Sequence, residues 1–271
     1  MIDIDKIVQV KSQDSFDSLI KLEYNSDITE FLIDASRSLN RLLSVDISAA
    51  VLFLSKLNKL KNFIPEKLYY RLTTFQARLE LWSGDYTKAL MHYSQALDIT
   101  IERRNFRAAA LIRKGMIEVY MYLGRYDEGI FIGKKALEYF RKTKSEIDAA
   151  QVLTNIGNIY HRMDKNQQAL SHYEKAQEIF KGKNEAAMAI VDFNRANIFA
   201  NLNQLAKAKE LYLKAGDFYK SKKMDLAWEQ TEYSIAYILY LETKYSDALK
   251  LFEKVYDSFV ALGDKKTAMV T

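Results

Sequence analysis

The sequence predicts an all-α protein, a solenoid of antiparallel helix hairpins in about six repeats. Three observations predict it. The 271 residues include only 9 Gly and 1 Pro, the two residue types that interrupt helices most strongly. Small side chains recur every 39 or 40 residues, and they lie on stripes of apolar positions with helical spacing. A hairpin that repeats in this way cannot bury its apolar face alone, so neighbouring hairpins must stack.

The period is defined by one column of small residues in the second helix of each hairpin. The column consists of Ala50, Ala89, Gly129, Ala169, Ala208 and Ala248, separated by 39, 40, 40, 39 and 40 residues. Nine residues earlier comes an apolar anchor of the first helix, at Tyr120, Tyr160, Phe199 and Leu239. A short polar turn joins the two helices, and Asp85 and Asp127 are expected to cap the second helix.

This period divides the chain from end to end. We expect an N-terminal capping segment at 1–27, a degenerate repeat at 28–67, and a further, truncated repeat starting at 269–271. Between them, five repeats are expected at 68–107, 108–147, 148–186, 187–226 and 227–268. The truncated repeat leads us to expect a fragment of a larger protein. A solenoid without a polar cap exposes an apolar face, so we expect this uncapped C-terminal end to self-associate or to lie against a missing domain. The face would comprise Tyr256, Phe259, Val260 and Leu262.

The second repeat departs from the column pattern at two positions. Gly129 and Gly133 stand where the other repeats have Ala and an aromatic or aliphatic residue. Each glycine inside a helix costs about 1 kcal/mol relative to alanine. Closer approach of the helices would offset this cost, and a hinge or ligand pocket at Gly133 is the alternative.

These columns resemble the tetratricopeptide repeat. The best matches are IGNIY at 156–160 with QQALSHYEKA at 167–176, SGDYTKALMHYSQA at 83–96 and KYSDALKLFEKV at 244–255. The usual repeat is about 34 residues long. The chain therefore resembles the 40-residue variety found in kinesin light chains, Pins-type polarity adaptors and bacterial peptide-sensing regulators. The resemblance implies a right-handed superhelix whose first helices line a concave wall.

The resemblance also implies that the free face of the first helices binds partners. Asn155 with Asn158, and Asn194 with Asn197, fall at matching places in consecutive repeats. A carboxamide offers both a donor and an acceptor to the backbone of an extended peptide. The alternative is that these amides bond neighbouring helices and that the aromatic residues near them pack between repeats. The candidate peptide-binding groove comprises Lys114, Gln151, Thr154, Asn155, Asn158, His161, Arg162, Phe193, Asn194, Asn197, Asn201, Gln230, Tyr233, Tyr237 and Tyr240.

Catalytic and metal-binding patterns are missing from the sequence. It contains 3 His and no Cys, and neither an HExxH nor a GxSxG motif. We therefore expect no enzymatic activity, no metal and no cofactor. The longest apolar run, ISAAVLFL, is far shorter than the ~20 residues that cross a bilayer, so no membrane partner and a cytoplasmic location are expected.

Charge does not favour nucleic acid as a partner. The net charge is +5, and basic clusters such as Lys220, Lys222 and Lys223 recur near the C-terminal ends of second helices. Cations at these ends oppose the helix dipole favourably, which explains the clusters without a phosphate ligand. A basic ridge that binds nucleic acid is the alternative, and it would predict binding that weakens steeply with salt.

Together these observations predict a non-enzymatic protein–protein interaction scaffold that binds an extended peptide segment in its concave groove. The alternative is a sensory or regulatory repeat region of a larger multidomain signalling or protease protein, whose effector lies C-terminal to this chain. The partner is a protein or peptide whose identity the sequence does not give. A partner held by its C-terminal carboxylate is not expected, because Ile190 and Asn194 stand where the resemblance would require a basic pair.

Overall fold

The computed structural model describes residue 7 and residues 10–261, and every regular element within this part of the chain is a helix. Contacts divide the chain into two compact units, Met1–Thr143 and Lys144–Thr271. The first unit contains α2 (Gln13–Tyr24), α3 (Ile28–Val45), α4 (Ile47–Lys59), α5 (Tyr69–Trp82), α6 (Tyr86–Glu102), α7 (Phe106–Tyr122) and α8 (Tyr126–Lys142), with two short 3-10 turns, Lys61–Phe63 and Glu66–Leu68. The second contains α9 (Glu146–Arg162), α10 (Asn166–Phe180), α11 (Glu185–Asn201), α12 (Leu205–Ser221), α13 (Asp225–Leu241) and α14 (Tyr245–Ala261).

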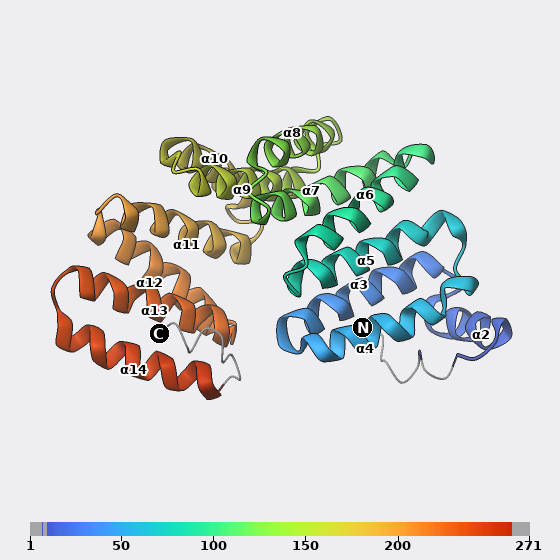
Figure 1. The fold of residues 1–271 in the computed structure, drawn as a ribbon, viewed down its shortest axis with the longest axis horizontal. Helices are drawn as coiled ribbons and strands as arrows, with labels where there is room; N and C mark the ends of the chain where they lie inside the picture. Colours follow the sequence, from blue (N-terminus) through green and yellow to red (C-terminus); the bar gives the residue numbers. More distant parts are fainter. Residues whose placement is uncertain (1–6, 8–9, 262–271) are drawn as a thin grey trace. The chain divides into compact units, whose positions relative to one another are not determined.

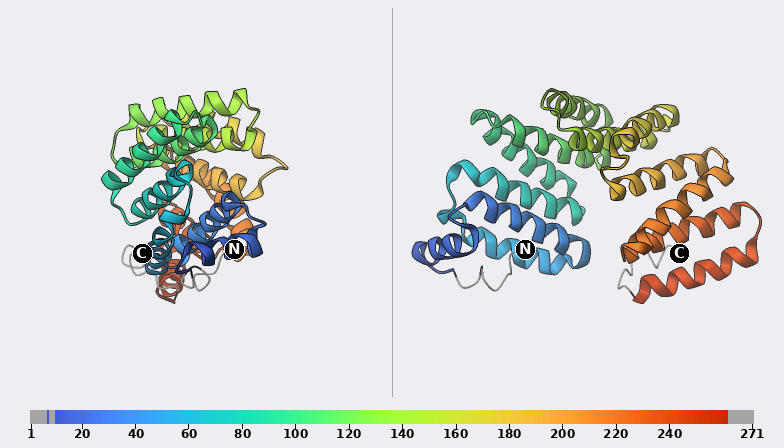
Figure 2. Two further views of the ribbon diagram at one scale, coloured as in Figure 1. Left: turned by 90° about the vertical axis from the view of Figure 1, so that its right-hand side faces the viewer. Right: turned by 180° about the vertical axis from the view of Figure 1, so that it is seen from behind.

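Within each unit, helices that follow one another in sequence pack as antiparallel hairpins, and the hairpins stack in chain order (Figures 1 and 2). The predicted all-α hairpin repeat is therefore confirmed. The column of small residues is buried where the helices of a hairpin meet: Ala50, Ala89, Ala169 and Ala208 are 0% exposed and Ala248 is 2% exposed. A methyl group at this position lets the second helix approach its neighbours closely, which is why the period is so clear in the sequence.

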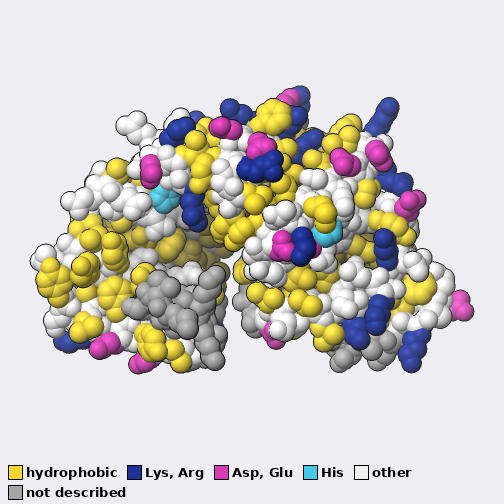
Figure 3. Space-filling model, in the orientation of Figure 1, with side chains coloured by type: hydrophobic (Ala, Val, Ile, Leu, Met, Phe, Trp, Pro, Cys, Tyr) yellow, Lys and Arg dark blue, Asp and Glu magenta, His cyan; other side chains and the backbone are white. Residues whose placement is uncertain are grey.

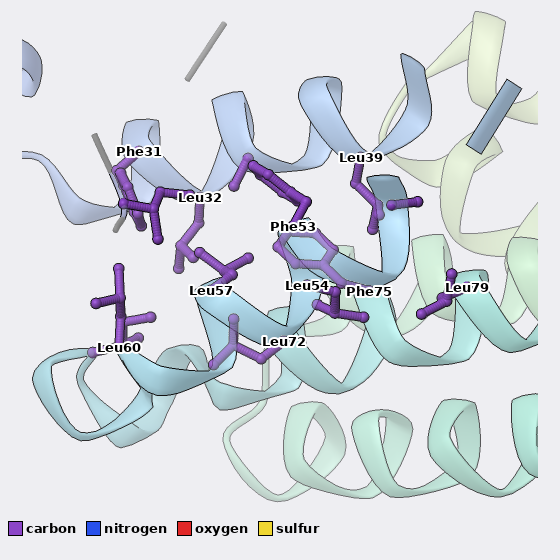
Figure 4. Close-up of a cluster of buried hydrophobic side chains, with 14 of the residues drawn as sticks. Phe31, Leu32, Leu39, Phe53, Leu54, Leu57, Leu60, Leu72, Phe75 and Leu79 are labelled. Carbon is purple, nitrogen blue, oxygen red and sulfur yellow. The ribbon is translucent and has the colours of Figure 1, made fainter. Parts of the chain in front are cut away.

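The largest core lies at the N-terminal end of the first unit. Side chains of α3, α4 and α5 converge there, among them Phe31, Phe53 and Phe75 (Figure 4). Phe16 of α2 closes the cluster, with its ring edge-on to Phe31 at 5.8 Å between centroids. The degenerate sequence of this region thus still builds a continuous apolar core, although the boundaries of the individual repeats stay a prediction.

Each hairpin turn from α5 to α14 contains one residue with a left-handed backbone. These residues are Gly84, Gly124, Asp164, Asn203 and Thr243, with φ between 56° and 81°. The left-handed conformation ends the first helix, and Gly, Asn and Asp adopt it at the least cost. Asp85 then caps α6 by accepting a hydrogen bond from the backbone N–H of Lys88 at 3.2 Å, as predicted.

The capping role predicted for Asp127 is wrong. The helix α8 begins at Tyr126, so Asp127 already lies in its first turn, and the residue that precedes the helix is Arg125. Arg125 occupies the register of Asp85, 40 residues later, and forms an ion pair with Glu128 instead of a side-chain cap. The acidic side chains of Asp127 and Glu128 still favour the helix start, because they face the positive end of the helix dipole.

The glycines of α8 are explained by the larger side chains of α7, the first helix of the same hairpin. Gly129 and Gly133 are both buried. Sixteen residues before Gly133 stands Ile117, which is 0% exposed, whereas the same register before Tyr173 holds Gly157. A larger side chain on the first helix thus accompanies a smaller one on the second, and this favours close packing over a hinge or pocket at Gly133.

The C-terminal hairpin corrects one expectation about the uncapped end. Phe259 is 0% exposed, because α14 packs against α13 and encloses Phe259 with Val255 and Tyr233. Tyr256 and Val260, on other faces of α14, are 47% and 49% exposed. Leu262 lies outside the described residues.

A buried carboxyl group in α13 leads to a prediction about pH. Glu229 is 3% exposed, and its Oε2 has no hydrogen-bond partner among the residues that the structure describes. Burial raises the pKa of Glu229, and a hydrogen bond with Ser258 and the charge of Lys254 offset this only in part. Folding therefore favours the protonated form, so the contribution of this group to stability is full below the unfolded pKa and is lost as pH rises through the folded pKa.

We accordingly expect Glu229→Gln to raise the melting temperature by a few degrees near pH 7 and to have little effect near pH 4. Thermal unfolding followed by circular dichroism at both pH values measures the difference. Glu253→Gln on α14 is the matched control, because its side chain is exposed to solvent. An equal gain at both pH values would show that the charge of Glu229 is not the cause.

Candidate functional site

The asparagines predicted to form a ladder lie on α9 and α11 of the second unit, and two of them touch. Asn158 Oδ1 accepts a hydrogen bond from Asn194 Nδ2 at 3.0 Å and another from the hydroxyl of Tyr173 at 2.7 Å. Both asparagines are half-buried. The two first helices therefore bring these two carboxamides into contact.

The next repeat contains the tyrosine–asparagine hydrogen bond of this arrangement. Asn197 Oδ1 accepts a hydrogen bond from the hydroxyl of Tyr212 at 2.6 Å. Each of these tyrosines lies 15 residues after its asparagine, in the second helix of the same hairpin. Sequence analysis missed Tyr173 and Tyr212, although the constant offset between a polar position and an aromatic column was a signal that could have found them.

A second polar contact joins the same helices one turn further along. The amide of Asn201 lies 3.2 Å from His161 Nε2. Burial lowers the pKa of His161, the charge of Arg162 lowers it further, and Asp164 opposes the shift. The imidazole is therefore neutral near pH 7, and its unprotonated nitrogen can accept a hydrogen bond from an amide.

The other predicted polar residues differ in what they offer. Asn155 is half-buried on α9 and makes no hydrogen bond within the described residues, so its carboxamide is available. Thr154 is 7% exposed and donates to the carbonyl of Ala150 at 3.0 Å, so its hydroxyl serves its own helix. Gln151 is half-buried, whereas Arg162 and Gln230 are exposed.

The predicted aromatic residues separate into two groups. Phe193 and Tyr233 pack inside the unit, against Tyr212 and Phe252 respectively, with 5.4 Å between ring centroids in both pairs. Tyr237 and Tyr240 instead stack on each other at 6.2 Å and are 47% and 51% exposed.

Tyr245 extends this exposed pair from the start of α14. Its ring centroid lies 5.7 Å from that of Tyr240, and its side chain is 59% exposed. Sequence analysis did not include this residue. Hydrophobic side chains are prominent on the part of the second unit that carries α13 and α14 (Figure 3).

Lys114 is the only predicted groove residue of the first unit. It lies half-buried on α7, with its Nζ 5.9 Å from the centre of the Phe140 ring. Its place in a groove with the second-unit residues stays a prediction.

A buried ionic network lies in the second unit, centred on α11. Asp192 of α11 is 1% exposed, and its Oδ2 lies 2.7 Å from the Nζ of Lys214. Its Oδ1 accepts a hydrogen bond from Gln177, whose own carbonyl oxygen accepts from Arg195 at 2.7 Å. This network joins α10, α11 and α12, and it was not predicted.

Two further searches concern the described residues only. No group of three or more His, Cys, Asp or Glu side chains in them could hold a metal ion. No helix among them is long and apolar enough to cross a membrane.

Stacked helix hairpins with a row of carboxamides on successive first helices define a helical repeat protein. Residues 106–182 and 148–221 match the family model described as tetratricopeptide repeat. The matched part of the chain is thus similar to tetratricopeptide repeats, as its motifs predicted.

Two curated relatives cover most of the chain. It is 26% identical to Protein KINESIN LIGHT CHAIN-RELATED 2 of Arabidopsis thaliana over 197 residues, which are 69% of this chain and 29% of that protein. It is 23% identical to Response regulator aspartate phosphatase E of Bacillus subtilis (strain 168), over 79% of this chain and 58% of that protein. The chain thus spans less than two thirds of the length of either relative.

Two solved structures share the fold. The crystal structure of a Rap protein complexed with Competence and Sporulation Factor has a TM-score of 0.74 and 18% identity, over 95% of this chain and 72% of that one. The crystal structure of NprR in complex with its cognate peptide NprX has a TM-score of 0.69 and 18% identity, over 95% of this chain and 78% of that one. At this level of identity the likeness concerns the fold alone.

Proposed function

We propose that this chain is a non-enzymatic interaction module whose second unit binds an extended segment of a partner protein or peptide along α9, α11 and α13. The observation that carries the proposal is the contact between Asn158 and Asn194, with Asn197 at the register of Asn158 one repeat later. These half-buried carboxamides are held in place by neighbours, and each keeps hydrogen-bonding capacity that no side chain in the described part of the chain uses.

The peptide backbone is the ligand that such a row suits best. An extended chain presents N–H and C=O groups at regular intervals, and amides can bond them without demanding a particular side-chain sequence. The exposed rings of Tyr237 and Tyr240 lie on the next first helix, where they would contact side chains of the ligand. NprR, whose structure contains a cognate peptide, supports a peptide as the class of ligand.

The proposed contact residues follow from the exposure and bonding of each side chain. Three predicted residues would support the carboxamide row without contacting the ligand, because they pack or form hydrogen bonds within the unit: Phe193, Tyr233 and Thr154. Lys114 stays a predicted contact from the first unit. The side chains proposed to face the ligand are Gln151, Asn155, Asn158, His161, Arg162, Asn194, Asn197, Asn201, Gln230, Tyr237 and Tyr240.

The test is an array of terminally blocked random decapeptides probed with the labelled protein. We expect the unaltered chain to retain a subset of peptides and the double variant Asn158→Ala with Asn197→Ala to bind them at least about tenfold more weakly, since each lost hydrogen bond is worth about 1 kcal/mol. The melting temperature should fall by only a few degrees, because each substitution removes the acceptor of one buried tyrosine hydroxyl but both amides lie at the edge of the core.

The matched control removes two amides elsewhere. Gln95→Ala with Gln167→Ala alters exposed residues on the second helices α6 and α10, and it should leave peptide binding unchanged. If the asparagine variant binds as well as the unaltered chain, or if it unfolds, the amides serve the fold and the proposal fails.

The second candidate is the sensory or regulatory region of a larger signalling protein. The likeness to a response regulator aspartate phosphatase favours it, because that relative extends well beyond the matched part. In this case the peptides selected by the array would change the activity of the full-length protein that contains this chain. Full-length protein whose activity does not respond to a bound peptide would exclude this candidate.

A further inference from the structure

Tyr173 and Tyr212 occupy one register position on the second helices α10 and α12, and each donates its hydroxyl proton to an asparagine. The oxygen-to-oxygen distances are 2.7 Å to Asn158 and 2.6 Å to Asn197. Both tyrosines are buried, with 0% and 3% of their surfaces exposed. A buried tyrosine normally finds a hydrogen-bond partner for its hydroxyl. Here the partner is a carboxamide that is also proposed to contact the ligand.

The same register in the other hairpins lacks this pair. Fifteen residues before Tyr93 of α6 the sequence has Arg78, a side chain with donors only. In α8 the tyrosine is replaced by Gly133, and in α14 by Phe252, which has no hydroxyl. Among the described hairpins, the tyrosine–asparagine pair thus coincides with the two repeats that carry the amide row.

Close packing holds the first of these rings in place. Sixteen residues before Tyr173 stands Gly157, and a Cβ atom added there would lie 2.6 Å from Tyr173 Cε1. The ring therefore lies directly against the backbone of α9, at a distance that only glycine allows. Tyr212 has Ala196 at the same register, and its ring packs edge-on against Phe193 at 5.4 Å.

The hydroxyls determine which end of each amide remains available. Asn158 Oδ1 accepts two hydrogen bonds, from Tyr173 and Asn194, which uses both of its lone pairs. Turning this amide over would place its NH₂ group against the NH₂ group of Asn194. Burial raises the pKa of Tyr212 to about 12 and also raises the pKa of Tyr173, so both hydroxyls keep their protons at neutral pH.

We propose that Tyr173 and Tyr212 are positioning residues that hold the carbonyl groups of Asn158 and Asn197 toward the hairpin and present their NH₂ groups to the ligand. The site would therefore select hydrogen-bond acceptors, which in an extended peptide are the backbone carbonyl oxygens. This inference rests on the proposed function. Amides held in one orientation lose less freedom on binding than amides that rotate, so the tyrosines raise affinity without touching the ligand.

The protein-side test removes only the hydroxyl oxygens. In the variant Tyr173→Phe with Tyr212→Phe, we expect binding to the selected decapeptides to weaken about tenfold, because two orienting hydrogen bonds of about 1 kcal/mol each are lost. The side-chain amide signals of Asn158 and Asn197 in ¹⁵N NMR spectra should shift and lose their restricted mobility, while backbone signals elsewhere stay in place. A purely structural role for the hydroxyls would lower the melting temperature and leave the binding unchanged.

The matched control is Tyr219→Phe. Tyr219 also lies buried on α12, at 5% exposure, and its hydroxyl bonds no asparagine within the described residues. This variant should bind the decapeptides as the unaltered chain does.

The ligand-side test weakens one acceptor at a time. In one selected decapeptide, each backbone carbonyl is replaced in turn by a thiocarbonyl, a poorer acceptor. At the two peptide carbonyls that accept from Asn158 and Asn197, we expect the replacement to lower the affinity for the unaltered chain about fivefold. This loss should be smaller in the double phenylalanine variant, because groups in one hydrogen-bond network couple. Equal losses in both proteins would overturn the selection of acceptors.

The outcomes separate this inference from the function on which it rests. If the phenylalanine variant binds normally while the double asparagine variant does not, the tyrosines do not position the amides and the proposed function stands. If the unaltered chain binds no decapeptide, the proposed function fails, and the selection of acceptors fails with it. Unchanged amide signals in the phenylalanine variant would overturn the positioning role in either case.

Discussion

Replacing Phe53 with alanine is expected to destabilise the first unit by about 3–5 kcal/mol, the usual range for removing a fully buried phenylalanine. Phe53 is 1% exposed and lies among side chains of α3, α4 and α5 (Figure 4). Removing its ring leaves a cavity. The neighbouring Phe31 and Phe75 are themselves buried and cannot move to fill it. Hydrogen exchange followed by mass spectrometry should show faster exchange in α3–α5 and a much smaller change in α9–α14.

Leu52→Ala is the matched control for this prediction. Leu52 precedes Phe53 on α4 and is 51% exposed, so its removal takes little apolar surface out of the core. We expect less than about 1 kcal/mol of destabilisation from this change. If the two variants unfold at the same temperature, α4 is not anchored by the described cluster. If exchange in α9–α14 rises as much as in α3–α5, the two units do not unfold separately.

Asp192→Ala is expected to cost the second unit about 3 kcal/mol, because it leaves buried polar groups without their partner. Asp192 accepts from Gln177 and lies 2.7 Å from Lys214, and Gln177 in turn holds Arg195. The loss should be smaller for Lys214→Ala, since the lysine side chain is 60% exposed and water can replace its charge. Chemical denaturation of the variants measures both costs.

The next repeat offers a control in the same register. Glu232 lies 40 residues after Asp192, and its side chain is 21% exposed and 3.5 Å from Lys254. Glu232→Ala should therefore cost less than about 1 kcal/mol, as is usual for pairs that water reaches. A similar cost for Asp192→Ala and Glu232→Ala would mean that burial is not what makes the network of Asp192 strong.

Most of the fold could be predicted from the sequence, since the strongest signal in the chain is local and periodic. A small residue at Ala169 or Ala208 and an apolar anchor nine positions earlier are both required by the contact between two adjacent helices. Such contacts join residues close in sequence, so their spacing is visible without coordinates. The misplaced cap at Asp127 shows the limit of this signal, because a shift of two residues changes a cap into a first-turn residue.

The candidate site could be predicted only in part. The register placed Asn158 and Asn197 on equivalent faces, and the structure brings Asn158 and Asn194 into contact. The direction of each amide and the packing of Phe193 and Tyr233 could not be predicted, because they depend on side chains of other helices. Burial of Asp192 likewise follows from the convergence of three helices.

The helix hairpins, their period and the small buried column of the second helices could be derived from the sequence alone. This was possible because helical periodicity reflects contacts between neighbouring turns and neighbouring helices. Only the tertiary structure decided that Tyr173 and Tyr212 bond the asparagines and that Tyr237 and Tyr240 remain exposed. The reason is that a hydrogen bond requires two atoms within about 3 Å, a condition that spacing along the chain does not contain.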